Sequence, residues 1–210
     1  LHILGYYIDV RSSRLLKGLE VVQEARRSRN PRLIENLQKL GIDITLDEVA
    51  LTAAGGQIGR PHVAQVLVKK GYVKDARQAF FKYLQKGAAA YEPKFRIPPA
   101  EALSLIRSAG GIAILAHPFT LSCKTELDLD AFVCELAGQG LQGMEVYYPE
   151  HSTDREQLYA RIARRHGLLL TGGSDFHGPA LNDVDLGTGR GSLCVPYRLL
   201  AEMKKAAGIE

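Results

Sequence analysis

The chain has 210 residues, a formal net charge of +4 and a hydrophobic fraction of 46%. This composition supports a sizeable core, and the mildly basic charge is compatible with an anionic substrate such as a phosphate ester without requiring a nucleic-acid partner. Cys123, Cys134 and Cys194 show no paired spacing, which argues against a disulfide scaffold and for a reducing compartment. No apolar run approaches the roughly 20 residues that cross a bilayer. We therefore expect a cytoplasmic protein with no membrane partner.

The first residues already have the pattern of a buried strand. Residues 1–9 include the apolar Leu1, Ile3 and Leu4, and no initiator Met precedes them. Natural chains rarely open inside a core strand. We expect that an N-terminal portion of the protein is missing from this sequence.

Residues 11–98 have the periodicity of helices joined by short polar segments. Apolar residues recur at helical spacing over 15–25 and 33–40, and Gly41 follows as a stop signal. Further helix starts are expected at Asp47, Arg60 and Asp75, the last running through Leu84. The pattern predicts an inserted all-helical subdomain over 11–98.

From residue 99 onward, helical and strand patterns alternate. Such alternation predicts parallel strands with helices outside, in an α/β fold built from residues 1–10 and 99–210. Because ligand-type residues follow two of the strands, a (β/α) barrel is favoured over an open sheet. Strands are predicted at 112–116, 143–147, 168–171 and, as a short last strand, 192–195; helices are predicted at 99–109, 128–138, 152–166 and 197–207.

Two predicted strands end in residues that could bind a metal ion. Asp175 and His177 follow the strand 168–171 within a turn flanked by glycines, which keep bulk away from the site. His117 follows the strand 112–116. Side chains at several strand ends can converge on one metal, and Asp and His are ligands for zinc, manganese or iron alike.

These residues resemble the PHP (polymerase and histidinol phosphatase) superfamily of metal-dependent phosphoesterases. The similar branch contains the nucleoside 3′,5′-bisphosphate phosphatases and 5′-to-3′ exoribonucleases. The motifs that carry the resemblance are His2 before Ile3-Leu4-Gly5, Arg60-Pro61-His62, Ala116-His117-Pro118, Gly143 to Ser152, and Gly173-Ser174-Asp175-Phe176-His177-Gly178.

The resemblance implies a distorted seven-stranded (β/α) barrel, here only partial, with up to three divalent ions in the intact protein. Manganese is expected, with zinc or iron as alternatives. The metal ligands would be His2, His117, Asp175 and His177. The opening His-x-His motif of the family, its Thr-Asp-His turn and a ligand Glu would precede His2 and are absent from this sequence.

The resemblance also implies that Arg60 and His62 hold the substrate phosphate. Three further residues have both a functional and a structural interpretation. Arg29, in a basic run with Arg26 and Arg27, either contacts nucleotide phosphates or belongs to a solvated helix face. His151 either donates a proton to the leaving group or is an exposed loop histidine. Glu145 either orients a metal ligand or pairs with a structural arginine.

The expected activity is hydrolysis of nucleoside 3′,5′-bisphosphates or of the 5′ ends of short RNA by a metal-activated hydroxide. The truncated chain could be inactive, and no stable protein partner is evident. One alternative is a non-catalytic module that binds nucleotide or nucleic acid through Arg60, His62 and the basic run. Another is an amidohydrolase-type barrel acting on C–N bonds, for which the sequence offers no candidate bridging lysine.

Overall fold

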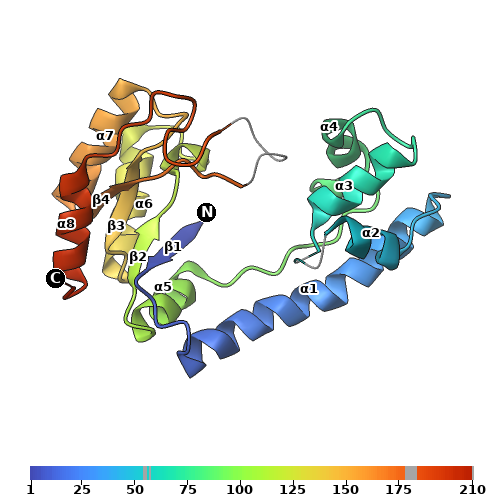
Figure 1. The fold of residues 1–210 in the computed structure, drawn as a ribbon, viewed down its shortest axis with the longest axis horizontal. Coiled ribbons are helices and arrows are strands. Elements are labelled where there is room, and N and C mark those ends of the chain that lie inside the picture. The colour runs from blue at the N-terminus through green and yellow to red at the C-terminus, as the bar shows by residue number, and fades with distance from the viewer. Residues whose placement is uncertain (54–55, 57, 178–183, 210) are drawn as a thin grey trace. The chain divides into compact units, whose positions relative to one another are not determined.

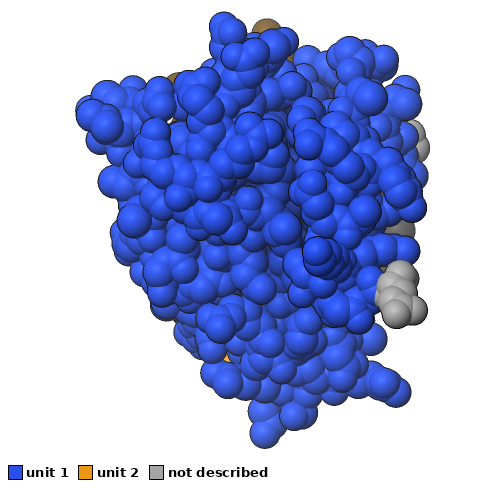
Figure 2. Space-filling model, turned by 90° about the vertical axis from the view of Figure 1, so that its left-hand side faces the viewer, with its two compact units in different colours: residues 1–18, 97–210 blue, residues 19–96 orange. Residues whose placement is uncertain are grey.

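The computed structural model describes residues 1–53, 56, 58–177 and 184–209. The chain divides into two compact units, coloured separately in Figure 2: residues 1–18 with 97–210, and residues 19–96. Cys123, Cys134 and Cys194 are free thiols. Over the described ranges, no helix has the length and apolar character needed to cross a membrane.

The first unit is built on a four-stranded sheet of order β1-β2-β3-β4 (Figure 1). The strands β2, β3 and β4 are parallel to one another, but β1 is antiparallel to β2, with Ile3 opposite Leu115. The prediction of uniformly parallel strands is therefore wrong for β1. The bounds are Ile3–Tyr6 for β1, Ile112–Leu115 for β2, Gly143–Tyr147 for β3 and Leu169–Gly172 for β4.

Helices pack on this sheet and bury its central strands. Every residue of β2 is buried, as expected of a strand covered on both faces. Ala113 and Leu115 pack in the main core, whereas Ile112 and Ile114 pack with Met203. The helices are α5 (Pro99–Ser108), the short 3-10 turn η2 (Pro118–Thr120), α6 (Glu126–Gly138), α7 (Thr153–Arg165) and α8 (Tyr197–Ala206). The mixed α/β prediction is confirmed.

Two details of the first unit correct the sequence prediction. Strand β1 lies at an edge of the sheet, so Leu4 remains 37% exposed instead of being buried. The predicted strand 192–195 is irregular backbone. It lies between Gly191, whose positive φ of 93° turns the chain, and Pro196, the N-cap of α8. Such flanks leave no room for a paired strand.

The second unit is helical. Its core includes Leu33, Leu37, Ile44, Leu67 and Leu84. Its elements are α1 (Ser13–Lys39, which starts in the first unit), α2 (Leu46–Thr52), α3 (Arg60–Lys69), α4 (Ala76–Ala79) and the π-helical turn η1 (Phe80–Leu84).

Three of the predicted helix boundaries in this unit were inaccurate. The two expected helices over 15–40 form one helix, α1, which continues through Pro31. Thr45, rather than Asp47, caps α2, because its side chain accepts from the amide of Glu48 while Glu48 bonds back to Thr45. The expected helix from Asp75 is one α turn that widens into a π turn.

Candidate active site

Sheet topology brings the predicted metal ligands of the first unit to one end of the sheet. We call this end the strand-end edge, to distinguish it from the lateral edge that β1 forms. The carboxyl ends of β2, β3 and β4 share that edge because these strands are parallel. Because β1 runs the other way, its start lies there too, and the amide of Ala116 donates to the carbonyl of His2 at 3.1 Å. A cavity of about 550 Å³ opens at this edge, lined among others by His2, His117, Glu145, Asp175 and His177.

The imidazole of His117 is held in one tautomer. Its Nδ1 lies 3.0 Å from Thr120 Oγ1, and the Thr120 hydroxyl donates to the carbonyl of His117 at 3.0 Å. The hydroxyl proton is therefore engaged, so Nδ1–H is the donor to Thr120 and Nε2 carries the lone pair. His2 Nδ1 lies 3.1 Å from that Nε2 and donates to it.

His177 is arranged in the same way. Its Nδ1 lies 2.7 Å from the carbonyl oxygen of Asp175. A carbonyl only accepts, so Nδ1 carries the proton and Nε2 keeps its lone pair. Metal-binding histidines commonly donate one ring N–H to a carbonyl or hydroxyl and bind through the other nitrogen. Both imidazoles have the chemistry of metal ligands.

The backbone is strained at two of the candidate ligands. His117 has a φ of 27° and Asp175 a φ of 53°, in the left-handed region that favours glycine. Such conformations cost free energy and persist only where the surroundings enforce them, often at functional sites. In these conformations the side chains of His117 and Asp175 both line the cavity.

Glu145 lies beneath this edge and contacts a candidate ligand. Its side chain is 4% exposed, and its Oε2 accepts from the amide of His117 at 2.7 Å. Burial raises the pKa of Glu145 to about 7. The hydrogen bond from His117 lowers this pKa, and the charge of Asp175 adds a smaller increase. Glu145 thus holds the strained His117 backbone. No ion pair with an arginine is found for it among the described residues.

Tyr148 is a further residue of the site that the sequence did not predict. Its hydroxyl donates to Asp175 Oδ2 at 3.1 Å, and its ring lies 5.7 Å from that of His117. The pKa of Tyr148 is raised, first by burial and then by the charge of Asp175. Its position directly after β3 was the available signal, because residues there share the edge with the other strand ends.

His151 is buried rather than exposed. It is 8% exposed and packs among the rings of Phe119, Tyr148 and Tyr159. Its Nδ1 donates to the carbonyl of Val146 at 2.7 Å, and its buried Nε2 has no hydrogen-bond partner in the described structure. Burial lowers the pKa of His151, so a proton-donor role would first require Nε2 to take up a proton.

The candidate ligands are of types that bind metal ions, but in the described residues they do not form a group of three or more around one point. Within residues 1–53, 56, 58–177 and 184–209, no group of three or more His, Cys, Asp or Glu side chains is placed to hold an ion. The donors instead interact in pairs, as His2 does with His117. Gly178, the last residue of the predicted turn motif, lies outside the described residues.

The predicted phosphate-binding residues lie in the helical unit. The Arg60 guanidinium lies 4.8 Å from the centre of the Tyr91 ring and donates to the carbonyl of Glu92. His62 Nδ1 accepts from the amide of Gly59 at 3.1 Å and so caps the start of α3. With Nδ1 engaged as an acceptor, the neutral His62 ring carries its proton at Nε2, where it can donate to a ligand.

Arg29 does not lie on a solvated face. It is 5% exposed and donates to Asn30 Oδ1 at 2.9 Å. The pKa of Arg29 is lowered by burial and then by the charges of Arg60 and Arg26. The exposed Arg27, by contrast, forms a 2.9 Å ion pair with Glu24 and matches the solvated-face interpretation.

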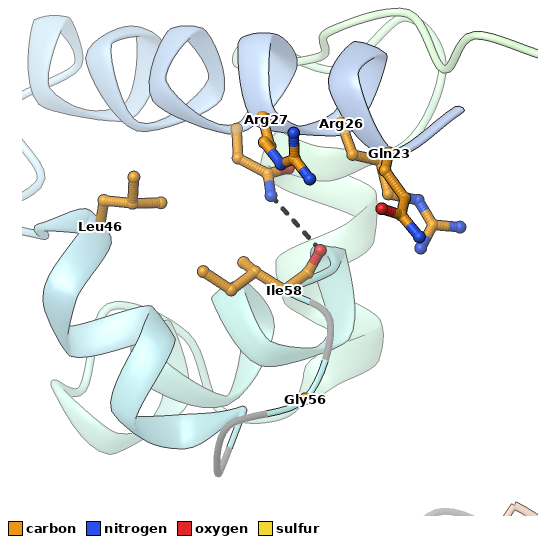
Figure 3. Close-up of a pocket in the computed structure, with 7 residues that line it drawn as sticks. Gln23, Arg26, Arg27, Leu46, Gly56 and Ile58 are labelled. Carbon is orange, nitrogen blue, oxygen red and sulfur yellow. Dashed lines mark hydrogen bonds between the residues drawn. The ribbon is translucent and has the colours of Figure 1, made fainter. Parts of the chain in front are cut away.

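A second cavity, of about 620 Å³, adjoins α1 in the same unit (Figure 3). Asn30 lies at its wall and donates to the carbonyl of Ile58 at 3.3 Å, shown as a dashed line in Figure 3. The residues that line it are Gln23, Arg26, Arg27, Asn30, Leu46, Gly56 and Ile58.

The chain is similar in sequence to two curated bacterial enzymes, although it matches no protein-family model. It is 34% identical over 187 residues to a 3′,5′-nucleoside bisphosphate phosphatase of Chromobacterium violaceum, covering 89% of this chain and 65% of that protein. It is 34% identical over 181 residues to the 5′-3′ exoribonuclease Rnm of Escherichia coli, covering 85% and 61%. The chain thus spans less than two thirds of the length of these relatives.

A solved structure extends the similarity to the fold. A protein from Bifidobacterium adolescentis, described as a metal-dependent phosphoesterase, superposes with a TM-score of 0.79 at 27% identity, covering 100% of this chain and 72% of that one. The fold is thus that of an α/β protein similar to metal-dependent phosphoesterases. More particularly, these similarities fit the PHP-type phosphoesterase that the sequence motifs predicted.

Proposed function

We propose that the protein is a metal-dependent phosphoesterase that acts on nucleoside 3′,5′-bisphosphates or on the 5′ ends of short RNA. The names of its relatives support this substrate class. The observation that carries the proposal is the tautomer of His117 and His177, whose Nδ1 protons are engaged so that Nε2 is the nitrogen with the lone pair. At His117 an ion would displace the hydrogen bond from His2.

In this proposal, His2, His117, Asp175 and His177 hold divalent ions, and manganese is the ion we propose. When bound, such ions offset the charge of the phosphate and activate water for attack. Glu145 and Tyr148 fix His117 and Asp175 in place. We further propose that the sheet is part of a distorted (β/α) barrel in a cytoplasmic protein that holds up to three ions when intact.

The helical unit supplies the substrate contacts. Arg29, Arg60 and His62 would hold a phosphate of the substrate through guanidinium and imidazole donors. His151 would accept, rather than donate, a hydrogen bond at Nε2 during the reaction, since its Nδ1 proton is engaged by Val146.

The proposal is tested by phosphate release from adenosine 3′,5′-bisphosphate, with manganese or with EDTA. Release that needs manganese and falls at least about a hundredfold in Asp175→Asn is expected, since one ligand carboxylate is lost. His166→Ala is the matched control because His166 pairs with Asp130, away from the strand ends. Equal turnover by Asp175→Asn and the parent would contradict the proposal.

A non-catalytic nucleotide-binding module is the second candidate. It is favoured by the finding that the described residues bring no three metal-binding side chains together. Nucleotide binding that persists in EDTA, combined with no phosphate release at any manganese concentration, would select this candidate over the phosphoesterase.

A further inference from the structure

The first unit contains a further cavity, of about 230 Å³, that belongs to neither site described above. Its wall is formed by residues of η2, of the start of α6 and of α7. It shares no lining residue with the cavity at the strand-end edge. Its volume lies below the roughly 300–1,000 Å³ of pockets for drug-sized ligands, so any occupant must be small.

A buried hydroxyl without a partner lies in the wall of this cavity. Tyr159 lines the cavity and is 4% exposed. Its ring packs against that of His151, but its hydroxyl has no hydrogen-bond partner among the described residues. Cys123 and Arg155, which line the same cavity, are the groups whose charges act on the pKa of Tyr159. Buried tyrosine hydroxyls usually have a partner, so this one indicates a polar group that a ligand would supply.

The charged groups around the cavity favour an anion. The Arg155 guanidinium lies 5.8 Å from the centre of the Phe119 ring and makes one 3.4 Å hydrogen bond, to the carbonyl of Glu150. No ion pair is found for Arg155 in the described parts of the chain, so most of its five donors remain for a ligand. Glu126, which also lines the cavity, already faces Arg161 at 3.9 Å. The N-terminus of α6 adds a partial positive charge.

Much of the remaining wall is apolar. Leu129 is 5% exposed, and Phe119, Leu121 and Leu158 are half-buried against the main core. A bare inorganic anion would leave these side chains without contacts, whereas a flat apolar ring would bury them. The lining therefore suits a small molecule with an apolar body and one negatively charged end.

We propose that this cavity binds a small aromatic carboxylate, with its ring against Phe119 and Leu129 and its carboxylate between the Tyr159 hydroxyl and the Arg155 guanidinium. The hydroxyl donates to one carboxylate oxygen and the guanidinium to the other. The bound ring covers the half-buried thiol of Cys123 in the same wall. Neither the candidate metal ligands nor the helical unit takes part, so the proposal is independent of the proposed function.

The test is a protein-observed NMR titration of the whole chain in EDTA with benzoate, which is a monoanion at about pH 7. Benzamide is the uncharged probe of the same shape. We expect a dissociation constant on the order of 1 mM for benzoate, as for a ligand of so few atoms. Benzamide should bind at least about tenfold more weakly, because it lacks the charge-assisted hydrogen bonds. Equal affinity for the two probes, or no saturable benzoate binding, would overturn the proposal.

Tyr159→Phe tests the hydroxyl. The variant should fold as the parent does, because the hydroxyl has no partner in the described structure, and should lose about tenfold in benzoate affinity. Tyr197→Phe is the matched control, since it removes a hydroxyl from an exposed tyrosine of α8 that does not line the cavity. Full benzoate affinity in Tyr159→Phe would contradict the proposed contact.

Arg155→Met tests the charge. This variant should bind benzoate no more tightly than benzamide, because the cation that pairs with the carboxylate is gone. Arg164→Met, at an exposed position of the same helix, is the matched control and should keep the preference for benzoate. A preference that persists in Arg155→Met would exclude Arg155 as the partner of the anion.

Cys123 reports where the ring binds. Saturating benzoate should slow the alkylation of Cys123 by iodoacetamide several-fold, measured by peptide mass spectrometry, because the ring covers the thiol. The reaction is followed at about pH 8.5, since alkylation needs the thiolate and burial raises the pKa of Cys123. Cys134 is exposed and should react at the same rate with and without benzoate. An unchanged rate at Cys123 would place bound benzoate outside this cavity and overturn the proposal.

Discussion

His2 Nδ1 and His117 Nε2 lie 3.1 Å apart, although 115 positions separate them in the sequence. The antiparallel pairing of β1 with β2 produces this contact, because Ile3 lies opposite Leu115. His2 directly precedes Ile3, and His117 follows Leu115 by two positions. The bond occupies the lone pair that a metal ion would take. Metal binding must therefore replace a histidine–histidine hydrogen bond with coordination by both rings.

Thr120→Val should weaken metal binding. The substitution removes the acceptor that holds the His117 Nδ1 proton, so the tautomer with a free Nε2 is no longer fixed. Loss of such a partner typically costs 10–100-fold in metal affinity, and we expect about tenfold for manganese, measured by electron paramagnetic resonance. Thr153→Val, on the exposed first turn of α7, is the matched control. An unaltered manganese affinity in Thr120→Val would show that Thr120 does not fix the ring.

Tyr148→Phe should impair the site more than the fold. It removes one hydrogen bond to Asp175 but keeps the ring that packs against His117. We expect a loss of about 1 kcal/mol in the free energy of unfolding and a several-fold loss of manganese affinity. Tyr159→Phe is the control, since Tyr159 packs on His151 and makes no hydrogen bond to Asp175 among those found. If both variants bind manganese equally well, Tyr148 does not orient Asp175.

Gly172→Ala should destabilise the sheet next to the site. A Cβ at Gly172 would lie 2.6 Å from Tyr147 Cβ and 2.7 Å from the Tyr147 carbonyl oxygen, so backbone must move. We expect a loss of roughly 1–3 kcal/mol in the free energy of unfolding, measured with urea.

Gly138→Ala is the opposite control for this prediction. Gly138 is the last residue of α6, and nothing lies within 4 Å of an added Cβ. This variant should be stabilised by about 0.4–1 kcal/mol, because alanine reduces the freedom of the unfolded chain. Equal stability of the two alanine variants would contradict the close approach of β3 and β4 at Gly172.

The strand-end positions of the candidate ligands could be predicted because their signal is local. An apolar run that ends in His117, or in the turn with Asp175, indicates a strand and the residue that follows it. The direction of β1 could not be predicted, because it depends on pairing with β2 more than a hundred positions later in the chain. That direction brings His2 to the same edge as the other strand ends.

In the helical unit, the sequence predicted the helices but not their continuity or which side chains are buried. Its apolar spacing predicted helices, but not that Pro31 would sit inside one continuous α1. A proline removes one amide donor, and packing of Leu33 and Leu37 outweighs that loss. The burial of Arg29 could not be predicted either, because a basic run has the same sequence pattern whether it faces solvent or is buried.

The most direct test of the account is manganese binding by this chain, followed by electron paramagnetic resonance as the ion is titrated in. The account predicts saturable binding that is weakened at least about tenfold in His117→Ala and in Asp175→Asn, because each removes one direct ligand. The His166→Ala control should bind as the parent does. No saturable binding, or binding that neither substitution changes, would contradict a metal site at the ends of β2 and β4.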